Sequence, residues 1–167
     1  RKRKDANISL GRIRSATASK QNKIKKDQSL LVEARELFEA HKSDPLFHTG
    51  IALYWAEGAK RNDMFHFMNS DSDMINILIA WLETYTNYKR GDVGLRLYTH
   101  EPFIRDNWEL WWQKELQVTP QQFKKTIIKP SSLGFKKRPN YKGCIRLEVP
   151  RSGGLLTQMK FLMNMLV

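Results

Sequence analysis

The segment from Gly50 to Gly58, GIALYWAEG, is apolar except for one carboxylate and ends in a glycine. Asp44 and Pro45 precede it, and this pair is typical of a helix N-cap followed by proline at the first helical position. A glycine after an apolar run is a common helix stop. These signals predict a helix over residues 45–58, and the rest of the chain is interpreted around it.

Two small residues of this helix, Ala52 and Ala56, are one turn apart and therefore share a face. A face this small allows another backbone to approach closely. Glu57 lies at the edge of the face, where the helix ends. The residues alone leave two interpretations open: a helix that packs closely against another backbone, or an ordinary core helix whose Glu57 points to solvent.

The segment resembles the LAGLIDADG motif of homing endonucleases. Five residues match its Gly, Leu, Ala, final acidic and final Gly positions: Ala52, Leu53, Ala56, Glu57 and Gly58. Gly50 and Trp55 depart from it, since they replace the leading Leu and the first Asp. Asn69-Ser70-Asp71 resembles the "NSD" that often opens the next helix in this family. The resemblance is to a single, degenerate motif and covers about residues 45–166.

The resemblance implies a homodimer in which two motif helices pack face to face across Ala52 and Ala56. It also implies that the paired Glu57 side chains bind Mg²⁺ and catalyse phosphodiester cleavage. One carboxylate per chain is too few for a two-metal site, so the pairing is needed. Members of the family place a long DNA-reading hairpin after this helix. Here only a brief strand around Lys60 and Arg61 is expected before the next one.

The chain has a formal net charge of +12, and the positive charge is concentrated in two segments. Residues 1–27 hold ten Lys or Arg and two Asp, and residues 120–142 hold seven Lys or Arg and no acidic residue. Such segments suit a phosphate backbone, although a solvated tail and a solvated loop would look the same. The predicted DNA-binding side chains are Lys60, Arg61, Lys136, Lys137, Arg138 and Lys142.

Two parts of the chain differ in composition. Residues 1–28 are polar and basic, which predicts an arm or linker that is disordered or only loosely helical without a partner. Residues 29–167 are predicted to form the LAGLIDADG-like domain, beginning with a helix capped by Ser29. Because the first residue is Arg1 and not Met, we expect the natural start to lie upstream.

Amphipathic helices alternate with short strands in the remaining sequence. Strands are expected at 64–68, 93–99, 123–129 and 143–149, and helices at 73–86, at 107–117 and after Ser152. Asp71 and Asp73 are expected to cap a helix rather than to bind metal, and Asp106 with Glu109 suggests a capping box. The pattern predicts an α/β (α+β) fold with a mixed or antiparallel sheet backed by helices.

The composition narrows the class of protein. A chain of 167 residues with 41% hydrophobic residues is long enough for one domain with a core. Cys144 is the single cysteine, so an internal disulfide and a cysteine-based zinc site are excluded, and a reducing, cytoplasmic setting is expected. No apolar run approaches the roughly 18 residues of a membrane span, so no membrane partner is expected.

Two functional classes follow. The first is a DNA-binding protein on a LAGLIDADG-like scaffold, as in some bacterial regulators, which would be nucleoid-associated in a bacterium. The shortened hairpin and the basic arm favour it. The second is a Mg²⁺-dependent DNA endonuclease, which Glu57 keeps open. Both act on double-stranded DNA, and RNA binding through the basic segments is a third possibility.

Overall fold

The computed structural model describes residues 2–61, 64–130 and 140–167. Its helices are α1 (Lys2–His41), α2 (Pro45–Glu57), α3 (Ser72–Tyr85), α4 (Trp108–Leu116) and α5 (Gly153–Met165). Its strands are β1 (His66–Asn69), β2 (Gly94–His100), β3 (Phe123–Lys129) and β4 (Cys144–Glu148). Short 3₁₀ turns cover Arg90–Asp92, Glu101–Asp106 and Pro120–Gln122. This mixture of helix and strand confirms the predicted fold class.

Within the described residues, four strands form one mixed sheet in the order β1-β4-β2-β3. Strand β4 is antiparallel to both β1 and β2, whereas β2 and β3 are parallel. Leu95 is paired with Leu147, and Leu97 with Ile145, so apolar side chains meet on one face of the central pair. All four of these side chains are buried. A mixed sheet with one apolar face agrees with the sequence expectation.

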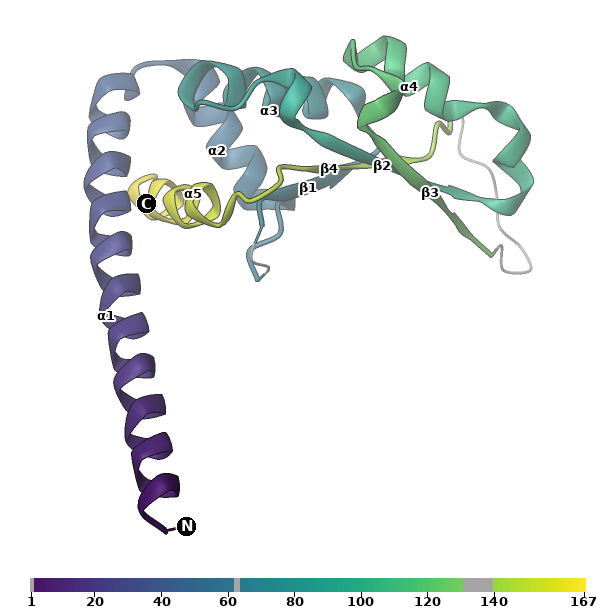
Figure 1. Ribbon diagram of the computed structural model, residues 1–167. Coiled ribbons are helices and arrows are strands. Elements are labelled where there is room, and N and C mark those ends of the chain that lie inside the picture. Colours follow the sequence, from purple (N-terminus) through teal and green to yellow (C-terminus); the bar gives the residue numbers. More distant parts are fainter. Residues whose placement is uncertain (1, 62–63, 131–139) are drawn as a thin grey trace.

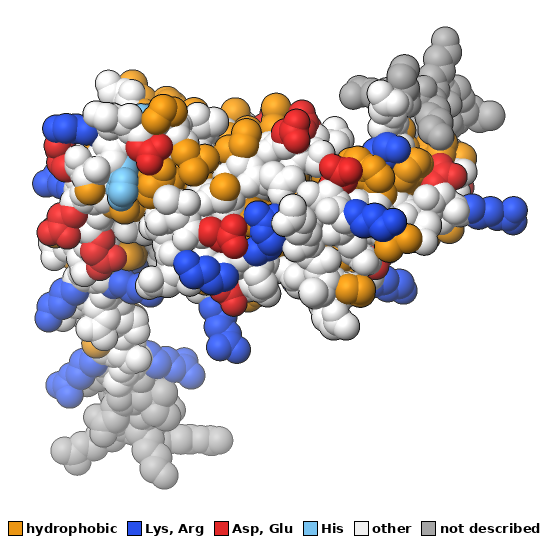
Figure 2. Space-filling model, turned by 90° about the horizontal axis from the view of Figure 1, so that it is seen from above, with side chains coloured by type: hydrophobic (Ala, Val, Ile, Leu, Met, Phe, Trp, Pro, Cys, Tyr) orange, Lys and Arg blue, Asp and Glu red, His pale blue; other side chains and the backbone are white. Residues whose placement is uncertain are grey.

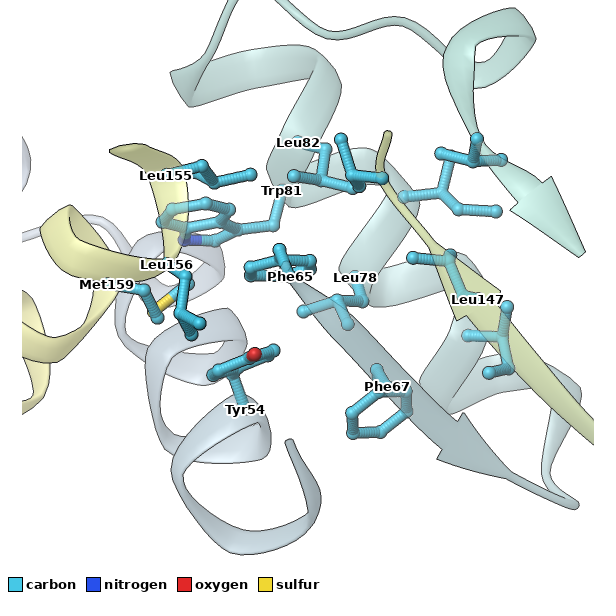
Figure 3. Close-up of a cluster of buried hydrophobic side chains, with 14 of the residues drawn as sticks. Tyr54, Phe65, Phe67, Leu78, Trp81, Leu82, Leu147, Leu155, Leu156 and Met159 are labelled. Carbon is cyan, nitrogen blue, oxygen red and sulfur yellow. The ribbon is translucent and has the colours of Figure 1, made fainter. Parts of the chain in front are cut away.

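The helices cover that apolar face. In Figure 1, α2, α3 and α4 lie on one side of the sheet, while α5 lies between the sheet and α1. The core between these layers contains stacked aromatic side chains, among them Tyr54 and Phe65, whose ring centroids are 4.2 Å apart (Figure 3). Trp81 is fully buried beside them and donates a hydrogen bond to the Phe47 carbonyl. None of the described helices lies over the opposite face of the sheet.

The predicted N-termini of two helices are confirmed. Asp44 caps α2 through a 2.9 Å hydrogen bond from the Leu46 amide, and Pro45 is the first helical residue. Asp71 caps α3 in the same way, accepting from the Asp73 amide at 2.9 Å. Asp71 therefore has the capping role that the sequence favoured over metal binding.

The prediction that a helix begins at Ser29 is wrong, because α1 runs without interruption from Lys2 to His41. Ser29 lies inside this helix, and its hydroxyl donates to the Glu33 carboxylate at 3.0 Å. The segment is rich in Lys and Arg, whose side chains lose little freedom in a helix, and it contains no proline. Composition had suggested an arm without stable structure. The described side chains of residues 11–26 are nevertheless all exposed, as expected of an arm.

Two smaller expectations are also wrong. Lys60 and Arg61 form a bend and not the expected brief strand, and in the described part of this segment an isolated bridge joins Gly58 to Phe67. The capping box before α4 does not form either. Asn107 takes the N-cap position in a left-handed conformation, with φ of 47°, without a side-chain cap. Glu109 instead accepts a 3.1 Å hydrogen bond from Thr126 of β3.

Candidate functional site

The face of the sheet without a helical layer carries the side chains that alternate with the buried apolar ones. Along β2, burial alternates residue by residue, with Leu95 and Leu97 inward and Arg96 and Tyr98 outward. Residues that are paired across neighbouring strands point to the same face of the sheet, so the strand register shows which side chains of β1, β3 and β4 lie beside Arg96 and Tyr98. We call this surface the open face. Cys144 and Ile127 lie on it opposite Tyr98, and its other members include His66, Met68, Arg96, Tyr98, His100, Lys124, Lys129, Arg146 and Glu148.

Positive charge dominates the open face. Arg96 of β2 is directly opposite Arg146 of β4 and Lys124 of β3 in the sheet register. Lys129 lies further along β3, with its ammonium 5.5 Å from the centre of the Tyr98 ring, within range of a cation–π interaction. These four cations share the surface with a single carboxylate among its described members, that of Glu148. The face is therefore strongly electropositive.

Glu148 organises the cations around it. Its carboxylate pairs with Lys124 and, at 3.1 Å, with Nε of Arg146. Burial of the Glu148 side chain opposes ionisation. The hydrogen bond from Lys124 and the charges of Arg146, Lys124 and Arg96 outweigh this effect and hold the pKa of Glu148 below its ordinary value. Glu148 is therefore ionised at neutral pH and fixes the positions of neighbouring cations.

A histidine at the β1 edge of the open face stays neutral. Burial, and then the charge of Arg146, lower the pKa of His66 below its ordinary value. His66 is paired with Glu148 in the sheet register. At neutral pH His66 thus adds no positive charge to the open face.

The sequence-predicted basic residues have different surroundings. Lys60 and Arg61 are exposed, and the segment that carries them descends below the sheet in Figure 1, on the side of the open face. Lys142 lies against α4 instead, with its ammonium 4.5 Å from the Trp108 ring centre and 5.2 Å from that of Trp111. Its carbonyl accepts a hydrogen bond from the Trp112 indole. Lys136, Lys137 and Arg138 lie outside the described residues.

Helix α2 has one buried side and one exposed side. Phe47, Ile51 and Tyr54 are fully buried, whereas Ala52 and Ala56 are exposed. The small face predicted from the sequence is therefore not covered by the described part of the same chain. Figure 2 views the molecule from the helical side and shows hydrophobic side chains spread among polar ones on that surface.

Glu57 is exposed at the end of this helix. No group of three or more His, Cys, Asp and Glu side chains suited to hold a metal ion occurs among the described residues. The described part of one chain thus offers a hard divalent ion a single carboxylate here, so a two-metal arrangement depends on the expected pairing of two chains.

Sequence reasoning missed the four cations of the open face as one site. The signal was present as alternation, since Arg96 interrupts an apolar run in β2 and Arg146 does so in β4. What the sequence did not contain was the register between the strands. Only the strand order shows that β2 and β4 are adjacent and bring both guanidinium groups to one surface.

Comparison with protein-family models, with curated proteins and with solved structures yields no match to this chain. Among the described residues, no helix combines the length and the apolar character that crossing a membrane requires.

Proposed function

We propose that the protein binds double-stranded DNA through the open face of a LAGLIDADG-like scaffold, in a regulatory rather than a catalytic role. The observation that carries this proposal is the cluster of Arg96, Lys124, Lys129 and Arg146 on the face that the helices leave uncovered. Such a role would place the protein in the cytoplasm, on the nucleoid in a bacterium.

The chemistry of this face fits a phosphate backbone. Guanidinium and ammonium groups neutralise phosphates, and the release of counterions makes the binding strongly dependent on salt. Strands also serve as DNA-contacting elements in several families of binding proteins. Tyr98 lies among the cations, and aromatic groups interleaved with basic ones are typical of nucleic-acid surfaces. Lys60 and Arg61, on the same side of the sheet, extend the surface.

The test is a salt titration of the full chain with a fluorescently labelled DNA duplex, followed by anisotropy. The open-face pair Arg96→Gln and Lys129→Gln is compared with Arg105→Gln and Lys114→Gln. Both control residues are exposed: Lys114 belongs to α4, which lies on the helical side of the sheet, and Arg105 belongs to the 3₁₀ turn before α4. Their replacement removes the same amount of charge. Each lost phosphate contact lowers the slope of log K against log salt by about 0.9, so the open-face pair should lower it by about 1.8. Wild-type protein that does not bind the duplex, or equal effects of both pairs, would refute the proposal.

A second candidate function rests on Glu57. The carboxylate is exposed beside the uncovered face of Ala52 and Ala56. If two chains pack through this face, two Glu57 side chains meet near the symmetry axis and could hold Mg²⁺ with the phosphate as a further ligand. Bound Mg²⁺ would supply Lewis-acid stabilisation of the scissile phosphate. The protein would then be a Mg²⁺-dependent DNA endonuclease.

A further inference from the structure

Helix α1 extends well beyond the body of the protein. Its C-terminal part packs on α5, where Ala34 is fully buried and Leu30 approaches Gly154. Its N-terminal part projects past the sheet on the side of the open face (Figure 1). The arm and the sheet therefore bound an angular space that is open to solvent.

One face of α1 changes character along its length. Leu30, Ala34 and Leu37 lie one turn apart and form the side that packs on the domain. Towards the N-terminus the same side continues with basic residues. Lys26 and Lys23 are one and two turns before Leu30, and Arg12 is 18 residues before it, which is five full turns. We call Arg12, Lys23 and Lys26 the inner stripe.

The inner stripe points towards the space bounded by the sheet. Because helix geometry places it in line with the residues that pack on α5, it faces the domain rather than away from it. All three side chains are exposed. Arg14 and Lys25 belong to the other side of the helix, since each follows an inner residue by two positions, or about 200°.

We propose that the inner stripe binds the phosphates of a DNA duplex that lies against the open face, so that arm and sheet hold the duplex from two sides. This inference rests on the proposed function. Arg12 and Lys26 are separated by about 21 Å along the helix at roughly 1.5 Å per residue. The major groove is about 12 Å wide, so the stripe is long enough to contact phosphates on both sides of it.

The charge of the arm favours DNA over a second copy of the arm as the partner that lies against the inner stripe. The described side chains of residues 11–26 include six cations and no carboxylate. Ile13 and Ile24, which are 62% and 48% exposed, are the large aliphatic side chains in that segment. Two such arms would repel each other with few apolar contacts to compensate, whereas a polyanion neutralises them.

The experiment uses the full chain and a labelled 30-base-pair duplex of mixed sequence. Arg12→Gln with Lys23→Gln removes two inner cations. Arg14→Gln with Lys25→Gln is the matched control, because it removes one Arg and one Lys that are also 11 residues apart, on the other side of the same helix. Glutamine keeps the helix propensity close to that of Lys and Arg, and circular dichroism checks that the helix is retained.

The inner pair should lower the salt slope by about 1.8 and the control pair should leave it nearly unchanged. Equal reductions would mean that the arm is only a diffuse positive charge, and no reduction in either would remove the arm from the interface; both results overturn the inference.

If light scattering shows that the inner pair of substitutions dissociates a dimer, the partner of the inner stripe is a second arm, which overturns the inference. Tighter binding of an RNA duplex than of DNA overturns the assignment of the ligand. Wild-type protein that binds neither the DNA duplex nor the RNA duplex would refute the proposed function as well. The other outcomes overturn only the role of the inner stripe, so the two failures can be told apart.

Discussion

The Tyr85 hydroxyl donates a 2.5 Å hydrogen bond to Oδ2 of Asp44, and this bond ties the last turn of α3 to the N-cap of α2. The other oxygen of Asp44 accepts from the Leu46 amide. The bond from Tyr85 is the main reason that the pKa of Asp44 lies below its ordinary value. Burial, followed by the same hydrogen bond, raises the pKa of Tyr85 to about 12. The pair is therefore a neutral donor and an ionised acceptor at neutral pH.

Replacing Tyr85 with Phe should make stability less dependent on pH in the acid range. A carboxyl group whose pKa is lower in the folded state stabilises the fold above its unfolded pKa, near 3.8. That contribution is lost as the pH falls through the folded value. Wild type should thus have a higher free energy of unfolding than Tyr85→Phe at pH 7, and the difference between the two should narrow below about pH 3.8. Urea unfolding, followed by tryptophan fluorescence, measures this difference.

The control is Tyr54→Phe, which removes a hydrogen bond to the carbonyl of Ala59 and involves no carboxylate. Its loss of stability should be the same at pH 7 and at pH 3. A constant gap for Tyr85→Phe over the same range would show that Asp44 does not titrate through this bond.

Gly50 of α2 lies directly against the side chain of Trp81 on α3. A Cβ added there would lie 2.2 Å from Cδ1 of Trp81, well inside van der Waals contact. Trp81 cannot retreat easily, because it is fully buried and bonded to the Phe47 carbonyl at 3.0 Å. Gly50→Ala should therefore destabilise the fold by about 1–3 kcal/mol, despite the roughly 1 kcal/mol gain in helix propensity.

Thermal and urea unfolding measure this effect. Gly11→Ala in α1 is the control, because an added Cβ meets nothing within 4 Å there. It should leave global stability unchanged or raise it slightly. If Gly50→Ala is as stable as wild type, the helices are able to move apart without cost, and the close approach is not a constraint on the fold.

Features with local causes were predictable from the sequence. The start of α2 follows from Asp44 and Pro45, and the faces of β2 follow from the alternation of Leu95 and Leu97 with polar neighbours. In each case the residues that decide the structure are within one or two positions of one another, so short-range stereochemistry and burial are sufficient.

Features that depend on distant partners were not predictable. Glu109 looked like half of a capping box, yet it bonds to Thr126 on β3. Lys142 remains a predicted DNA contact, but the position of its ammonium over the ring of Trp108 on α4 could not be seen in the sequence. The open face required the pairing of β2 with β4, which are separated by about 50 residues. These contacts are fixed by tertiary packing, which sequence periodicity does not encode.

Ala52→Leu tests whether the exposed small face of α2 joins two chains. Overpacking typically costs about 1–3 kcal/mol, so the dimer dissociation constant should rise by about 5- to 150-fold. Sedimentation equilibrium over a range of concentrations measures the change. Ala40→Leu is the control, since Ala40 is also an exposed helical alanine but belongs to α1. Wild-type protein that stays monomeric at high concentration, with and without DNA, would rule out the paired Glu57 site.

Glu57→Gln separates the two candidate functions. Glutamine keeps the size of the side chain and removes its charge, and Glu57 is exposed, so the fold should survive. If the protein is a Mg²⁺-dependent nuclease, loss of this ligand should remove nicking of supercoiled plasmid, since the bound ions supply several kcal/mol of transition-state stabilisation. DNA affinity without metal should stay the same or rise, because a negative charge near the phosphates has gone.

Glu36→Gln is the matched control, an exposed glutamate on α1 that should have no effect on nicking. In a DNA-binding protein without nuclease activity, wild type and Glu57→Gln should bind the duplex equally at high salt, and neither should nick with Mg²⁺. Nicking that survives in Glu57→Gln would exclude this carboxylate as an essential ligand. Asp71 and Asp73 would be the next to test, and because Asp71 caps α3, its replacement should also lower stability by about 1 kcal/mol.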